Sequence, residues 1–112
     1  MDLADAIKLV TNGDRALAFR EVQLAAAEGN ASAMGILGVL YYAGEGVPED
    51  GELARILLAE AAALGDATAA HNLGTLYATG APPVERNPKK ARLFHGLGRS
   101  RDPHLGFPED EG

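Results

Sequence analysis

The chain has 112 residues, with 10 Lys plus Arg against 16 Asp plus Glu and a formal net charge of −6. This length fits one domain, and the absence of cysteine excludes disulfides, thiolate metal sites and thiol catalysis. The acidic balance disfavours a nucleic-acid binder, no apolar run is long enough to span a bilayer, and the acidic N-terminus does not resemble a leader peptide, so we expect a cytoplasmic protein.

In chain order, hydrophobic periodicity and the positions of Gly, Asn, Asp and Pro predict six helices. Their ranges are 2–11, 14–28, 31–43, 51–64, 67–79 and 88–98. Asp50 is expected to begin one helix, and Asn87 another, with Pro88 as its first residue. Four glycines stand where a helix end favours positive φ: Gly29, Gly44, Gly65 and Gly80.

An internal repeat organises the middle of the chain. Residues 25–44 and 61–80 are related by a shift of 36, and 11 of the 20 aligned positions are identical. The shared apolar residues follow one stripe of a helix, which predicts a core. They are Ala33, Leu37, Leu40 and Tyr41 in one copy and Ala69, Leu73, Leu76 and Tyr77 in the next. Gly38 and Gly74 lie on the same stripe, so we expect neighbouring helices to approach closely there.

Short links alternate with longer loops, so consecutive helices must pack antiparallel. The predicted fold is all-α, a short α-solenoid of three antiparallel helix hairpins. Residues 1–98 would form the repeat domain, with an atypical hairpin at 1–30 and repeats at 31–66 and 67–98. Residues 99–112 are interpreted as a tail that is mobile or lies on the surface, where Leu105 and Phe107 could contact the domain.

The repeated residues resemble the Sel1-like repeat family, a relative of the tetratricopeptide repeats. The first copy carries the family motif as Gly29, Ala33, Leu37-Gly38, Tyr41, Gly44-Glu45-Gly46-Val47, Asp50, Ala54 and Ala61-Ala62. The second copy keeps Gly65, Ala69, Leu73-Gly74, Tyr77, Gly80 and Ala91 but departs from the motif in its loop, 81–87. The resemblance implies an interaction scaffold or adaptor of a kind common in bacteria. Some bacterial members of the family are immunity proteins that neutralise secreted toxins, so the resemblance also implies this more specific role as an alternative.

We expect a protein or peptide partner to bind the concave face, which the first helix of each hairpin lines in a solenoid. The candidate residues are Ser32, Gly35, Val39, Tyr42 and Ala43 in one repeat and Thr68, His71, Thr75, Ala78 and Thr79 in the next. Residues 1–56 carry a net charge of −5, which could attract a basic partner. Self-association through the solenoid ends is a further hypothesis.

Other polar groups are assigned no chemistry. The three histidines, at positions 71, 95 and 104, lie on different segments without metal-ligand spacing, so neither a metal nor a cofactor is predicted. Ser32, His71 and Asp66 could be written as a triad, but no nucleophile elbow or oxyanion feature accompanies them. A hydrolase of the β-lactamase type is disfavoured, because the relatives credited with that activity are rich in cysteine.

Residues 86–101 contain six basic residues and no acidic one. Two interpretations stay open: a solvated last helix neutralised by the acidic tail, or a surface for an acidic partner. Nucleic acid is not expected here, because neither an aromatic platform nor a net positive field is present. Taken together, the sequence predicts a non-enzymatic protein that binds another protein.

Overall fold

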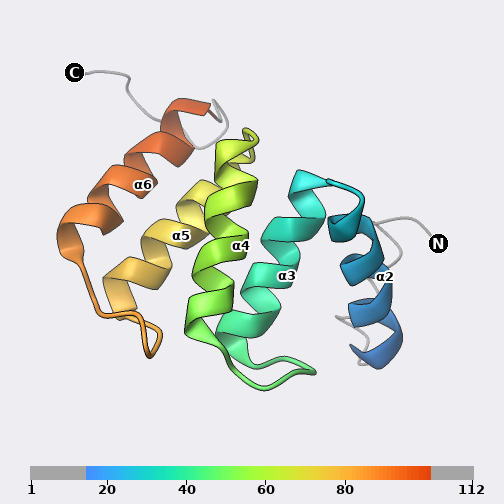
Figure 1. Cartoon of the computed structure of the whole chain (residues 1–112). Coiled ribbons are helices and arrows are strands. Elements are labelled where there is room, and N and C mark those ends of the chain that lie inside the picture. Colours follow the sequence, from blue (N-terminus) through green and yellow to red (C-terminus); the bar gives the residue numbers. More distant parts are fainter. Residues whose placement is uncertain (1–14, 102–112) are drawn as a thin grey trace.

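The computed structural model describes residues 15–101, which form five helices (Figure 1). Their bounds are Arg15–Ala27 for α2, Ala31–Ala43 for α3, Gly51–Ala63 for α4, Ala67–Thr79 for α5 and Pro88–Arg101 for α6. This part of the chain contains no strand, and one isolated bridge joins Ala81 to Val84. The predicted helix at 2–11, its linker and the segment 102–112 lie outside the described residues.

The helices follow one another side by side from α2 to α6 (Figure 1). Each packs against the next, and the α3–α4 and α5–α6 pairs share the most extensive contacts. α3 and α5, the first helices of two successive hairpins, also contact each other. The predicted all-α solenoid is therefore confirmed for the part of the chain that the structure describes.

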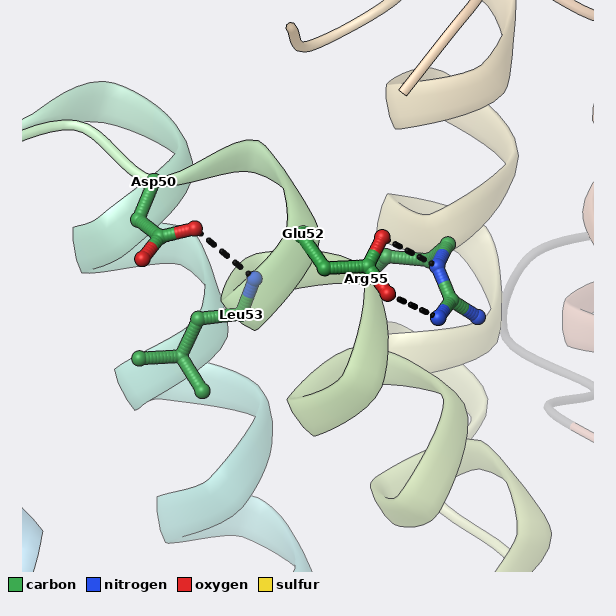
Figure 2. Close-up of polar contacts among 4 residues, drawn as sticks. All are labelled: Asp50, Glu52, Leu53 and Arg55. Atoms are coloured by element: carbon green, nitrogen blue, oxygen red, sulfur yellow. Dashed lines mark hydrogen bonds and ion pairs between the residues drawn. The ribbon is translucent and has the colours of Figure 1, made fainter. Parts of the chain in front are cut away.

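Each described helix from α3 to α6 begins at a capping side chain. The side-chain oxygens of Asn30, Asp50, Asp66 and Asn87 accept hydrogen bonds from the backbone N–H three residues ahead, at 2.9 to 3.1 Å. Figure 2 shows this bond from Leu53 N–H to Asp50. These bonds satisfy donors that a helix start leaves without an intrahelical partner, so they fix where each helix begins.

The predicted helix ends are mostly confirmed. Gly29, Gly44, Gly65 and Gly80 all have positive φ, as expected after a helix. α6 continues to Arg101, three residues past its predicted end at 98, so residues 99–101 belong to the helix and not to the tail. Neither Gly96 nor Gly98 adopts positive φ, and the next proline comes only at Pro103, so nothing stops the helix earlier.

The core consists of two clusters of buried apolar residues. One joins α4, α5 and α6 around Leu58, Leu73 and Leu76, and the other joins α2 and α3 around Val22 and Leu37. Met34 and Tyr41 pack against both clusters and so connect them. The predicted core stripe is buried except for Tyr41, which is half-buried and meets the Phe19 ring edge-on at a centroid distance of 6.0 Å.

Glycines permit close helix contacts, as the repeat pattern predicts. A Cβ atom at Gly38 would lie 2.9 Å from Leu58 Cγ and 3.3 Å from the Ala54 carbonyl oxygen. At Gly74, a Cβ atom would overlap the ring of His95. Both glycines therefore bring the first helix of a hairpin against the second helix of the same hairpin.

Candidate functional site

The candidate surface lies on α3 and α5, where predicted site residues of adjacent repeats meet. The Tyr42 hydroxyl and Thr79 Oγ1 form a hydrogen bond of 2.6 Å across the repeat boundary. Val39, Tyr42 and Ala78 are half-buried and pack against the same core cluster. The two helices therefore present one continuous surface that carries an aromatic hydroxyl.

The predicted residues differ in exposure. Val39, Tyr42, Thr75 and Ala78 are half-buried. The exposed members are Ser32, Ala43, Thr68, His71 and Thr79.

Gly35 corrects the prediction, because it is buried and cannot contact a partner. A Cβ atom there would lie 3.3 Å from Ala69 Cβ and 3.8 Å from Ala61 Cβ. Its place on the helix points it toward the next repeat, where the lack of a side chain lets α3 approach α5. Gly35 is therefore a packing residue of the repeat junction.

Neither α3 nor α5 contains an Asp, Glu, Lys or Arg residue. The acidic residues between 44 and 66 lie instead in the loop after α3, on α4 and at the cap of α5. The polar side chains of α3 and α5 therefore carry hydroxyl, amide and imidazole groups, and the others are apolar. A basic partner would find no carboxylate on these two helices themselves.

His71 of α5 and His95 of α6, which lie on different segments of the sequence, come together at the end of the described solenoid. Their ring centroids are 4.8 Å apart, and Thr75 Oγ1 lies 3.3 Å from His95 Nε2. Partial burial lowers the pKa of His95, and the nearby His71 and Arg99 lower it further.

The sequence contained a signal for this contact. The loop before α6 is one residue longer than the loop before α4, so α6 aligns with α4 at a shift of 37. His95 therefore occupies the position of Leu58, opposite Gly74, just as Leu58 lies opposite Gly38. A shift of 36 would have placed Phe94 there instead.

The described residues offer no group of three or more side chains that could hold a metal ion. Asp66 caps α5 by accepting a hydrogen bond from Ala69 N–H, while the His71 ring lies against the His95 ring at a tilt of 33°. Two residues of the hypothetical triad, Asp66 and His71, thus have other contacts. Within residues 15–101, no helix is both long and apolar enough to cross a bilayer.

Comparisons with known proteins identify the repeats. The Sel1 repeat family model matches residues 31–66, 67–95 and 92–107. The chain is also similar to the crystal structure of a Sel1 repeat protein from Oxalobacter formigenes, with a TM-score of 0.78 and 26% sequence identity. That alignment covers 89% of this chain and 41% of the other, so the chain spans less than half the length of that protein. No curated protein matches the chain.

Proposed function

Because the chain belongs to the Sel1 repeat family, whose members are generally protein-interaction scaffolds, we propose that it is a non-enzymatic scaffold that binds a protein or peptide segment on the concave face. The observation that carries this proposal is the continuous surface of α3 and α5, joined by the bond between Tyr42 and Thr79. Aromatic side chains with a polar tip are common anchors in protein interfaces.

The chemistry of this surface indicates the kind of segment it would accept. Val39 and Ala78 offer apolar contact, while Ser32 and Thr68 are exposed hydroxyl donors and acceptors. Since α3 and α5 carry no charged side chain, an uncharged segment with mixed polar and apolar residues fits them best. The basic partner suggested by the acidic residues would have to use contacts beyond these helices.

A surface-blocking variant tests this proposal. Thr68→Arg adds a bulky cation at an exposed position of α5, and Gln23→Arg adds the same side chain at an exposed position of α2. Tagged versions of both would be used to capture partners from the source organism, with mass spectrometry as the readout. We expect a stoichiometric partner to be lost with Thr68→Arg and retained with Gln23→Arg. Retention by both variants would contradict the concave-face assignment.

A toxin-neutralising immunity protein is one specific form of this function, and a captured toxin would identify it. We propose no hydrolase activity, in keeping with a family that is generally non-catalytic. Turnover of a chromogenic β-lactam or a simple ester that disappears in His71→Ala would contradict this. Self-association through the solenoid ends remains a prediction that size-exclusion chromatography under dilution can test.

A further inference from the structure

The exposed side of α6 is strongly basic. Residues 86–101 contain six basic residues and no acidic one. Five of these basic side chains are exposed: Arg86, Lys89, Lys90, Arg92 and Arg99. No carboxylate in the described part of the chain pairs with Lys89 or Arg92. This surface belongs to a second helix of a hairpin and is separate from the α3–α5 surface.

Comparison with α4 shows that the fold does not require this charge pattern. At the shift of 37, Glu52 of α4 corresponds to Lys89, and Arg55 corresponds to Arg92. In α4, the carboxylate accepts two hydrogen bonds from the guanidinium, one of them 3.0 Å from Arg55 Nε to Glu52 Oε1 (Figure 2). These bonds lower the pKa of Glu52 and raise that of Arg55. In α6, the same two positions hold like charges.

The position of two lysines within α6 is also unfavourable for the helix. Lys89 and Lys90 directly follow Pro88 in the first turn, where the helix dipole favours negative charge. Lys90 is partly compensated, because its ammonium lies 5.3 Å from the centre of the Tyr77 ring. Lys89 makes no such contact with a described residue. Side chains that are unfavourable for their own helix, and that gain no compensating contact in the fold, are expected where a surface has a function.

An apolar side chain lies among these cations. Leu93 is 65% exposed, and it follows Lys89 by four residues and Lys90 by three. These spacings place the three side chains on one face of the helix. The face therefore combines a central apolar contact with surrounding positive charge.

We propose that this face of α6, defined by Lys89, Lys90, Arg92 and Leu93, binds an acidic segment of a protein partner. Carboxylates of the partner would pair with the three cations, and an apolar side chain would cover Leu93. The charge complementarity selects an acidic partner. The exposed leucine at its centre favours protein over nucleic acid.

The aromatic residues nearby support the choice of protein. Phe94 and Tyr77 stack on each other with a centroid distance of 5.8 Å, and Tyr77 is buried. Their rings are therefore engaged inside the hairpin and do not form a platform on which bases could stack. This proposal does not depend on the concave-face function.

The test measures binding of a short fluorescein-labelled peptide of glutamate and leucine to the full chain by fluorescence anisotropy. Lys89→Glu reverses one charge on the proposed face, and Arg20→Glu reverses one exposed charge on α2 as a matched control. We expect Lys89→Glu to weaken binding about tenfold and Arg20→Glu to leave it within about twofold. Equal affinities for the wild type and Lys89→Glu would overturn the proposal.

Two further measurements distinguish other occupants. The chain's own residues 102–112 contain four acidic residues, so a full-length variant with Glu109→Gln, Asp110→Asn and Glu111→Gln is compared with the wild type. Binding of the peptide only to that variant would mean that residues 102–112 of the chain itself occupy the face, which would contradict binding of a partner there. A single-stranded oligonucleotide of equal charge should compete more weakly than unlabelled peptide, and stronger competition would also overturn the proposal.

Discussion

Gly38 of α3 lies against Leu58 and the Ala54 carbonyl of α4, whereas at Gly96 of α6 no atom of the described residues lies within 4 Å of the place where a Cβ atom would stand. The two glycines therefore respond oppositely to the same substitution. We expect Gly38→Ala to destabilise the fold by about 1–3 kcal/mol, because the methyl group overpacks the hairpin. Gly96→Ala should stabilise it by roughly 0.5–1 kcal/mol through helix propensity.

Chemical denaturation of the two variants and the wild type measures this difference. A Gly38→Ala variant as stable as the Gly96→Ala variant would show that α3 and α4 are not in close contact at this position. Gly38→Leu should be more damaging still, since a larger side chain cannot be accommodated beside Leu58.

His95 gives the fold a pH dependence. Its pKa in the folded chain is lowered from the ordinary 6.5 by partial burial, by His71 and by Arg99, so the unfolded state binds the proton more readily. The stability associated with neutral His95 is therefore present above about pH 6.5 and is lost as the pH falls through the folded pKa. We expect the melting temperature to fall between about pH 7.5 and about pH 5.

Two variants test whether His95 causes this pH dependence of the melting temperature. His95→Leu copies the leucine that occupies the matching place in α4, and His95→Gln keeps a polar side chain near Thr75 without an ionisable ring. Both should show a smaller drop in melting temperature over the same pH range. A drop as large as that of the wild type would assign the pH dependence to other groups.

At the scale of helices, the caps determine where each element begins. Asp50 accepts the Leu53 N–H at 3.0 Å, so Asp50→Ala leaves that donor without its side-chain partner. We expect a loss of about 1 kcal/mol, while Asp50→Asn keeps an acceptor and should cost only a few tenths. Thermal or urea unfolding of the two variants measures this, and an equal loss in both would argue against the capping bond.

α6 offers the converse prediction. Lys89→Glu places a carboxylate in the first turn, three residues before Arg92, and so restores the pattern of Glu52 and Arg55 in α4. We expect a gain of a few tenths to about 1 kcal/mol from the helix dipole and the new pair. A variant that is more stable yet binds the acidic peptide less well would separate the two roles, whereas a less stable variant would contradict the helix argument.

Helix boundaries and caps were largely predictable because their signals are local. The starts of α3, α4, α5 and α6 follow from Asn30, Asp50, Asp66 and Asn87, each a good acceptor three residues before a free amide. The end of α6 was not predictable in this way, because the helix continues through Gly96 and Gly98, neither of which has positive φ. A glycine in a sequence can mark either a helix end or a close contact.

The candidate site was only partly predictable because it depends on contacts between repeats. Periodicity placed Tyr42 and Thr79 on the same kind of face, and the structure brings them into a hydrogen bond. The same periodicity misassigned Gly35. Periodicity shows which residues point away from the core of their own hairpin, but it does not show which of those residues are buried by the next repeat. The contact between His71 and His95 depends on the length of the loop before α6, which sets the register of that helix against α5.

At the scale of the whole molecule, the row of helices predicts unequal local stability. Within the described residues, α5 contacts α3, α4 and α6, whereas the contacts of α2 are chiefly with α3. Local opening should therefore require less free energy in α2. We expect amide hydrogens of α5 to exchange more slowly than those of α2, as measured by native-state hydrogen exchange. Equal protection in both helices would indicate that the described chain opens as one unit.

The uncharged character of α3 and α5 has a practical consequence. A contact made there would be nearly indifferent to ionic strength, because no Coulomb attraction is available to be screened. A contact made by the lysines of α6 would weaken steeply as salt rises. If partners bind both surfaces at once, a salt gradient would distinguish them, because it would elute the partner bound to α6 and leave the partner on α3 and α5 in place.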